Sequence, residues 1–371
     1  MTHPDYRVLM AGVVPPPVHG ASLSTRALFD ADLAPVSKVL LEIRSSTNLE
    51  SVGKASIGKG LGLIALVVRC LWLKLTKGGS VLYYTPGSAS FVPFVRDVLF
   101  LGFCRPFFSK TVLHYHSGGL PDYLNASRIR NILGRWIYGR GAWAISLSRH
   151  TPVPGLAFGA EQEFEVANGL DVPPISPIER DDEEFRVLFL GNLYEDKGVF
   201  DLLKACMLAA AKLSKPIRLR FVGKWPDEAT REAFEVLGSQ APANLKIDPP
   251  APAYGEDKWK ALAEADVFAF PSFYRSENFP LVLIEAFACG LPVVATNWRG
   301  IPSIIEEGVN GYMVEPNDCE ALADKLVELA RDPELRARLA KQGRETYEHR
   351  LNLSAHVGAM REILLKACQA N

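Results

Sequence analysis

The chain lacks the residue patterns of several common protein classes. Its six cysteines, at positions 70, 104, 206, 289, 319 and 368, form no C-x-x-C pair, and its histidines show no zinc-ligand spacing. The cysteines are therefore expected to be free thiols in a reducing compartment. No G-x-G-x-x-G occurs in the first loop, which weakens a dinucleotide-binding interpretation. The N-terminal stretch MTHPDYRVLMAG has no charged region followed by a long apolar one, so it is not predicted to be a signal peptide.

Long apolar runs are also scarce. The segment Gly60–Leu75 has a nine-residue uncharged core before Arg69, which is too short to span a bilayer. It is either a core helix of the first domain with basic ends or a segment that lies on an anionic membrane surface, and both interpretations stay open. The basic residues around it are Lys54, Lys59, Arg69, Lys74 and Lys77.

Composition is that of a globular chain with two domains. Of the 371 residues, 48% are apolar and 22% are charged, and the net charge is −1. The charge is unevenly distributed, because residues 1–160 hold 17 Lys/Arg and 7 Asp/Glu, a balance of +10, whereas residues 161–371 carry −11. The basic half is expected either to meet an anionic partner or to be an ordinary solvated face.

Strand and helix patterns alternate through both halves of the chain, which predicts parallel sheets covered by helices. We expect two doubly wound, Rossmann-like α/β domains that face a cleft. The first spans residues 1–172, with a C-terminal helix at 350–371 packing back on it. A linker rich in Pro and charge follows at 173–184, and the second domain spans 185–349. The predicted strands are Arg7–Ala11, Val81–Thr85, Thr111–Tyr115, Ala142–Ser146, Phe185–Gly191, Ile217–Gly223, Asp266–Phe270 and Pro292–Thr296.

The most informative segment is Ser276–Gly290, SENFPLVLIEAFACG. Pro280 suits the start of a helix, and the helix that follows, Leu281–Cys289, is apolar on every face except at Glu285. A carboxylate in a buried helix is costly unless it is paired, so Glu285 requires a partner from elsewhere in the fold or from a ligand. With Glu277 just before the helix, the segment could grip a phosphorylated sugar, and a structural pair with an Arg is the alternative.

Other candidate residues follow predicted strands, where parallel sheets bind ligands. After Ala11 comes GVVPPPVHGAS, in which Gly20 stands at a helix start. After Gly191 comes NLYEDKGVF, in which Lys197 could meet a phosphate or be a solvated loop residue. Strand alternation places His114 and His116 on one face, as structural or functional groups.

Together these motifs resemble the retaining glycosyltransferases of family 4, which have the GT-B fold. The second-domain signature, two glutamates eight positions apart followed by a GLPVVAT strand, is present as Glu277, Glu285 and residues 290–296. PPPVHG, HYHSGG, ANGLD and GNLYEDKG resemble further family segments in the same order.

The resemblance implies a role for each matching residue. Glu285 would hold the nucleotide ribose and Glu277 the donor sugar, while Lys197 would bind the diphosphate and His116 would approach the reacting centre. Glu277, His116 and Lys197 are thus the predicted catalytic residues. No metal or other cofactor is expected, since no D-x-D motif stands in a suitable context. The other predicted donor-binding residues are Gly20, Gly191, Asn192, Gly223, Asn278, Phe279, Pro280, Leu281, Val282 and Arg299.

Two positions depart from the family pattern. The family usually has Arg where this chain has Asn192, so the diphosphate clamp lacks one positive charge. The family often has a Gly pair after the strand that corresponds to Pro292–Thr296, whereas this chain has Asn297, Trp298, Arg299 and Gly300. Arg299 or Arg275 could restore the charge, unless Arg299 pairs with a carboxylate such as Glu306.

The resemblance implies transfer of a sugar from a nucleotide-diphosphate donor, UDP being the family's commonest nucleotide, to a glycan or lipid-linked acceptor in surface polysaccharide or glycolipid biosynthesis. The expected location is the cytoplasm, at the inner face of the membrane through residues 54–77, with no nucleic-acid partner. The alternatives are a catalytically weak partner subunit of the same fold, a nucleotide-sugar epimerase and an NAD-dependent dehydrogenase. Donor sugar, acceptor, linkage and oligomeric state are not predicted.

Overall fold

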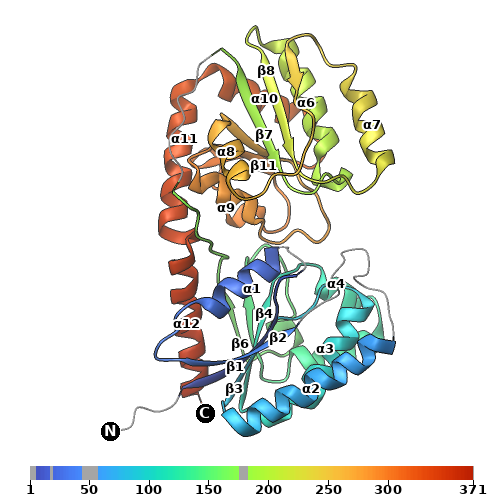
Figure 1. The fold of residues 1–371 in the computed structure, drawn as a ribbon, viewed down its shortest axis with the longest axis vertical. Helices are drawn as coiled ribbons and strands as arrows, with labels where there is room; N and C mark the ends of the chain where they lie inside the picture. The colour runs from blue at the N-terminus through green and yellow to red at the C-terminus, as the bar shows by residue number, and fades with distance from the viewer. Residues whose placement is uncertain (1–5, 17–19, 44–56, 175–182, 371) are drawn as a thin grey trace. The chain divides into compact units, whose positions relative to one another are not determined.

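A computed structural model describes residues 6–16, 20–43, 57–174 and 183–370 of the chain. The chain divides into two compact units, of which the first comprises residues 1–170 with 352–371 and the second residues 171–351. Each unit is a six-stranded, all-parallel sheet covered by helices, as the alternating sequence pattern predicts (Figure 1). Parts of three predicted segments lie outside the described residues, namely 17–19 of PPPVHG, 54–56 of the basic segment and 175–182 of the linker.

The sheet of the first unit has the strand order β2-β1-β3-β4-β5-β6. Its central strands are buried on both faces, as parallel strands between two helix layers must be. The strands are β1 (Arg7–Val13), β2 (Ser37–Ile43), β3 (Val81–Tyr84), β4 (Lys110–Tyr115), β5 (Trp143–Ser146) and β6 (Gln162–Glu165). The helices are α1 (Gly20–Asp30), α2 (Ile57–Lys77), α3 (Phe91–Cys104), η2 (Arg105–Phe107), α4 (Leu120–Asn125), α5 (Arg128–Tyr138), η3 (Leu156–Phe158) and α12 (Leu353–Gln369).

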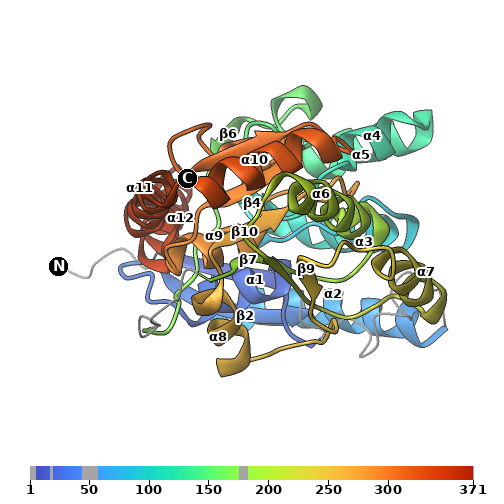
Figure 2. The ribbon, with the colours of Figure 1, turned by 90° about the horizontal axis from the view of Figure 1, so that it is seen from above.

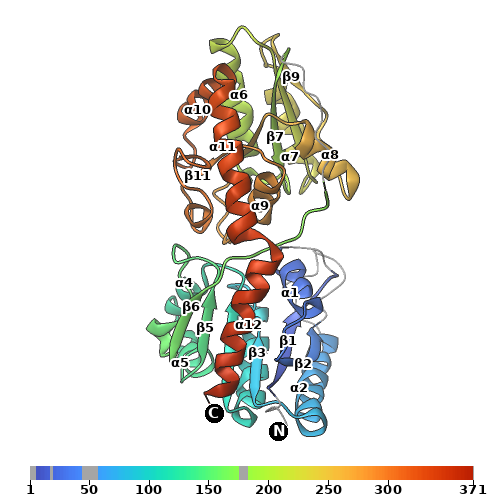
Figure 3. The ribbon, with the colours of Figure 1, turned by 90° about the vertical axis from the view of Figure 1, so that its left-hand side faces the viewer.

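Two hydrophobic cores lie on opposite faces of this sheet. Strand alternation sends Leu9 and Ala11 into the core beneath α2, α3 and α5, and Val8 and Met10 into the core beneath α1 and α12. Figure 3 shows α12 running along β3 and β1, although more than 180 residues separate it from the rest of its unit in the sequence. Helix α12 therefore completes one side of the first sheet.

The sheet of the second unit has the strand order β12-β11-β10-β7-β8-β9. Helices α6 and α10 lie side by side against it (Figure 2). The strands are β7 (Phe185–Leu190), β8 (Ile217–Val222), β9 (Leu245–Ile247), β10 (Val267–Phe270), β11 (Val293–Thr296) and β12 (Gly311–Val314). The helices are η4 (Glu195–Lys197), α6 (Val199–Lys212), α7 (Glu228–Gly238), α8 (Glu256–Glu264), α9 (Leu281–Ala288), η5 (Ile301–Ser303), α10 (Cys319–Arg331), α11 (Pro333–Thr346) and η6 (Tyr347–Leu351).

The basic segment of the first half forms the long helix α2, which packs against α3 and β2. Cys70 and Leu73 are buried in the core beneath it, so the inner side of the helix is a core face. No helix among the described residues is both long and apolar enough to cross a bilayer.

Three histidines lie together inside the first unit. His114 on β4 contacts the ring of His116 at a centroid distance of 4.2 Å and that of His356 on α12 at 5.9 Å. The common face of His114 and His116 was predicted from strand alternation. His356 Nδ1 donates to the carbonyl of Ala167 at 2.7 Å, and Tyr83 Oη lies 2.8 Å from His114 Nδ1. Burial lowers the pKa of His356, and lowers that of His114 far more.

The lowered pKa values of His114 and His356 predict that the first unit loses stability in acid. In the unfolded chain the two histidines take up protons near pH 6.5, whereas in the folded chain they do so only at lower pH. Their contribution to the free energy of unfolding is therefore fully present above about pH 6.5. Below that pH it falls by about 1.4 kcal/mol per pH unit for each histidine. Protection of β4 amides against hydrogen exchange should therefore decrease between pH 7.5 and 5.5. The variant His356→Gln should show a smaller decrease, and an unchanged decrease would contradict the assignment.

Candidate functional site

The carboxyl ends of the parallel strands in the second unit meet at one edge of the sheet, and the loops there approach one another closely. A Cβ atom on Gly223 would lie 1.8 Å from the carbonyl oxygen of Gly191, and one on Gly198 would lie 2.2 Å from that of Pro271. Gly198 also has φ +76°. Only glycine allows these backbone segments to lie so close.

Hydrogen bonds tie three of these loops into one structure. The amide of Phe273, after β10, donates to the carbonyl of Asp196 in η4 at 2.9 Å. Trp298 Nε1, after β11, donates to the carbonyl of Tyr274 at 3.0 Å, and the Thr296 hydroxyl donates to the carbonyl of Ser272. The loops after β7, β10 and β11 are therefore held in fixed positions relative to one another, and a binding site requires such rigidity.

Two of the predicted catalytic residues meet in this structure. Lys197 Nζ donates to Oε2 of Glu277, and the Ser272 hydroxyl donates to the same oxygen at 3.0 Å. The side chains are only 15% and 10% exposed, so the ion pair is largely shielded from water. The ammonium also lies 4.6 Å from the ring centroid of Tyr274. Lys197 is therefore a positioned charge rather than a solvated loop lysine.

The start of α9 lies directly after this pair. The helix begins at Leu281, one residue later than the proline position suggests, and Pro280 is the extended N-cap residue. Its first backbone N–H groups have no partner within the helix. Asn278 is buried, and neither Oδ1 nor Nδ2 of its side chain has a hydrogen-bond partner among the described residues. Unpaired buried amides of this kind call for a ligand or ordered water.

Glu285, one turn further along α9, has a partner that the sequence did not identify. Lys258 Nζ, on α8, donates to Oε1 at 2.8 Å, whereas the buried Oε2 has no hydrogen-bond partner in the described part of the chain. Burial raises the pKa of Glu285, and Lys258 acts against that shift. The carboxylate is therefore held in place by one oxygen and can accept hydrogen bonds at the other.

The two candidate arginines lie in the loops after β10 and β11, which the hydrogen bond from Trp298 to the Tyr274 carbonyl links. Arg275 is exposed, and Arg299 is partly buried with φ +46° and its guanidinium 5.5 Å from the Trp298 ring centroid. No ion pair between Arg299 and Glu306 is present among the described residues. Asn192, where the resemblance leads one to expect an arginine, is exposed after β7. The remaining predicted residues Phe279, Leu281 and Val282 surround the α9 start.

The first unit holds the other two predicted site residues. Gly20 is the first residue of α1, and His116 follows β4 at the carboxyl edge of its sheet. The buried side chains of Ser24 and Thr25 lie in the first turns of the same helix. Thr25 donates to the carbonyl of Ala21 at 2.8 Å and would clash with any side chain at Gly12.

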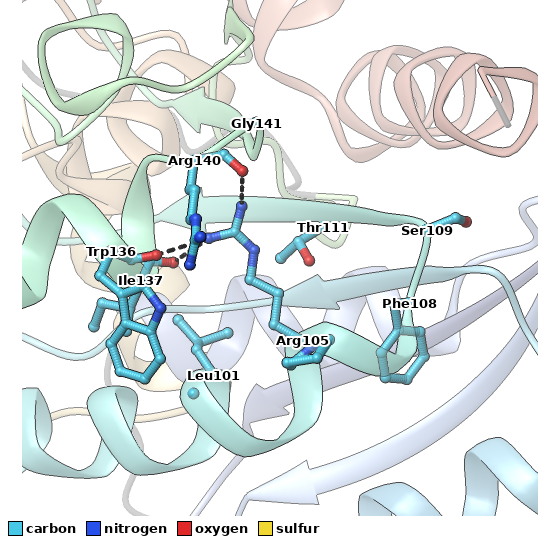
Figure 4. Close-up of a pocket in the computed structure, with 11 residues that line it drawn as sticks. Leu101, Arg105, Phe108, Ser109, Thr111, Trp136, Ile137, Arg140 and Gly141 are labelled. Atoms are coloured by element: carbon cyan, nitrogen blue, oxygen red, sulfur yellow. Dashed lines mark hydrogen bonds between the residues drawn. The ribbon is translucent and has the colours of Figure 1, made fainter.

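A separate pocket of 310 Å³ lies at the other edge of the first sheet, where β4 and β5 begin (Figure 4). The Arg105 guanidinium forms one wall and donates to the carbonyls of Ile137, Gly139 and Arg140 at 2.8–2.9 Å. The pocket lies away from His116, so it is not part of the predicted donor site. Where the structure describes the chain, no three His, Cys, Asp or Glu side chains are gathered as a metal site would need.

Two six-stranded parallel sheets with these strand-end loops define the GT-B fold. The chain is similar over 97% of its length to the whole of Anabaena Alr3699/HepE, a structure solved in complex with UDP, with a TM-score of 0.72 and 18% identity. At that identity the likeness establishes the fold alone.

The sequence of the second unit is similar to that of known glycosyltransferases. Residues 175–346 match the family Glycosyl transferases group 1. The chain is 36% identical over 165 residues to the sulfoquinovosyl transferase SQD2 of Arabidopsis thaliana, covering 44% of this chain and 30% of that protein. It is 29% identical over 229 residues to the phosphatidyl-myo-inositol mannosyltransferase of Mycobacterium leprae, covering 60% and 58%. The matched stretch thus spans less than two thirds of the length of either relative.

The close approach at Gly198 gives a test of how the loops are held. Gly198→Ala places a methyl group against the Pro271 carbonyl, whereas Gly308→Ala has a similar φ of +71° and open space around it. We expect Gly198→Ala to lower the free energy of unfolding of the second unit by roughly 1–3 kcal/mol more than Gly308→Ala, because overpacking adds to the common backbone strain. Equal urea midpoints for the two variants would show that the loops yield without cost.

Proposed function

We propose that the protein is a retaining glycosyltransferase of family 4, which transfers a sugar from a UDP-sugar to a glycan or lipid-linked acceptor in surface polysaccharide or glycolipid biosynthesis. The observation that carries the proposal is the arrangement at α9, where the Lys197–Glu277 pair precedes the helix start and Glu285 presents an open oxygen one turn later. The UDP in the HepE structure supports the choice of donor, and the phosphatidyl-myo-inositol in the name of the Mycobacterium leprae relative supports a lipid-linked acceptor.

Each residue has a distinct proposed task at this site. Glu285 accepts from the ribose hydroxyls through its open Oε2 while Lys258 holds Oε1. Glu277 contacts donor-sugar hydroxyls, and Asn278 donates to the donor through its unpaired amide. His116, in the first unit, approaches the reacting carbon, and Gly20 at the start of α1 faces the donor phosphate.

The leaving diphosphate needs its developing charge neutralised in the transition state. Lys197 supplies one positive charge, and we propose that Arg299 supplies the charge that Asn192 lacks. The N–H groups at the α9 start and the backbone at Gly191 and Gly223 add fixed dipoles. No cofactor other than the donor takes part in this proposal. The enzyme would act in the cytoplasm, at the inner face of the membrane.

Hydrolysis of nucleotide sugars tests the function without knowledge of the acceptor. The protein is incubated with UDP- and GDP-sugars, and release of the nucleotide is measured. Slow release from one UDP-sugar, with the α-configured donor giving the α-configured sugar first by NMR, supports a retaining transferase. Absence of release from every donor, despite nucleotide binding, would favour the catalytically weak partner subunit.

The open oxygen of Glu285 predicts the nucleotide affinity of a variant. Glu285→Gln keeps the shape of the side chain but removes the charge that accepts from two hydroxyls. A hydrogen bond to a charged group contributes roughly 1.5–3 kcal/mol, so UDP should bind about tenfold or more weakly by calorimetry. Glu264→Gln, at the C-terminal end of α8 where Glu264 pairs with Arg220, serves as the control and should bind UDP normally. Unchanged affinity in folded Glu285→Gln would exclude the ribose role.

The role of Arg299 is tested with a variant that has little structural consequence. Since no ion pair holds Arg299 among the described residues, Arg299→Gln should change the free energy of unfolding by less than about 0.5 kcal/mol. Turnover of the donor should fall at least tenfold. Arg140→Gln is the matched control, because Arg140 has a similar φ of +50° but lies in the first unit, away from the predicted site. Normal turnover of Arg299→Gln would show that Arg299 does not supply the second positive charge at the diphosphate.

A further inference from the structure

Exposed large apolar side chains are concentrated on one part of the first unit. Of the seventeen in the described residues, eleven lie on α2, α3, η2 and α5, and the other six are scattered over both units. We name this set the basic apolar face. Its members are Ile64, Val68, Trp72, Leu75, Phe91, Leu99, Phe103, Phe107, Ile129, Ile132 and Trp136.

The helices that carry these side chains are neighbours. Helix α3 packs against α2 on one side and against α5 on the other, and η2 continues directly from α3. The contact between α3 and α5 is intimate, because a Cβ atom on Gly102 would lie 2.7 Å from the Trp136 ring. The 310 Å³ pocket opens between α3, η2 and α5 (Figure 4). The three helices that carry most of these side chains therefore adjoin one another on the same unit.

The exposed residues follow the spacing of a helix face. On α2 the exposed side chains Ile64, Val68, Trp72 and Leu75 follow at steps of four, four and three, and on α3 Leu99 and Phe103 stand four residues apart. Side chains at these intervals lie on the same side of a helix. The inner sides of the same helices already fill the core of the first unit. These helices are thus apolar on two faces, and the fold uses only one of them.

The charge around the face is predominantly positive. Residues 57–141 hold eleven Lys or Arg and two Asp or Glu, a balance of +9. Asp97 is the only acidic residue on α2, α3, η2 or α5, and it is fully buried, where it accepts hydrogen bonds from Tyr84 and Tyr138. The exposed basic residues among these helices include Arg69, Lys77, Arg128 and Arg135.

We propose that the basic apolar face docks on the surface of an anionic lipid bilayer. Aromatic and aliphatic side chains enter the headgroup region, and each Lys or Arg near the surface adds roughly 1 kcal/mol of attraction to anionic lipids. A second copy of the chain is disfavoured as the occupant, since it would bring two surfaces of the same positive charge together. From the sequence, the basic first half and the apolar segment around residues 54–77 indicated such contact, and the structure adds exposed apolar side chains on α3, η2 and α5.

Flotation with lipid vesicles tests the proposal, and it requires no donor sugar, so its outcome is independent of the proposed activity. The protein should float with vesicles of 70% phosphatidylcholine and 30% phosphatidylglycerol, and at least tenfold less with pure phosphatidylcholine. Raising the salt from 0.1 M to 0.5 M should release it, because the screening length is about 10 Å at 0.1 M. Equal partitioning onto both vesicles, or none, would overturn the proposal.

Variants locate the surface. Trp72→Glu and Phe103→Glu should each lower partitioning onto anionic vesicles at least tenfold, whereas the control Val236→Glu, equally exposed on α7, should bind like the unaltered chain. For the unaltered protein, tryptophan fluorescence should be quenched by brominated lipids, and Trp72→Phe should remove much of that quenching. Variants that bind vesicles normally but disrupt a dimer in sedimentation velocity would instead assign the face to a second copy.

Discussion

The candidate site depends on one constraint, which is that a carboxylate shielded from water must have a cation beside it. Glu277 satisfies the constraint through Lys197, and Glu285 does so through Lys258. Each pair joins two elements that are far apart in sequence, η4 to the loop after β10 and α8 to α9. The same pairs that make the buried charges tolerable therefore also fix the geometry of the loops.

The two pairs differ in what they leave for a ligand. Lys197 and Ser272 both engage one oxygen of Glu277, so this carboxylate is oriented by two donors. Glu285 receives a single donor, and its other oxygen is buried without one among the described residues. A buried acceptor left open costs free energy in the folded protein, and binding of a hydroxyl removes that cost.

The central strands of both sheets could be predicted from the sequence, but the edge strands could not. The predicted strands are central ones, whose apolar runs are continuous because both faces are buried. The strands β2, β6, β9 and β12 were not predicted, and all four are sheet edges, where one side lacks a neighbour. β6 reads QEFE and β9 has only three residues, so neither carries a strong pattern.

The site shows the same limit. Glu277, Glu285 and Lys197 were predicted from their local context, since each stands beside a helix start or inside an apolar helix. Lys258 and Ser272 were not, because nothing in EDKWKALAE or in the loop after β10 indicates which carboxylate the folded chain brings near. Contacts between distant segments depend on the strand order of the sheet, which local patterns do not encode.

The path of the chain has a consequence for synthesis. The core beneath α1 and α12 contains Met360, Ile363 and Leu364 together with Val8 and Met10, so β1 packs against a helix that is made only after the whole second unit. During translation this apolar face of the first sheet stays uncovered while residues 171–351 are made. All residues of the second unit are therefore available before α12, which the first unit still lacks. The second unit is therefore complete before the first, and the uncovered face of the first sheet needs protection from aggregation until α12 has been made.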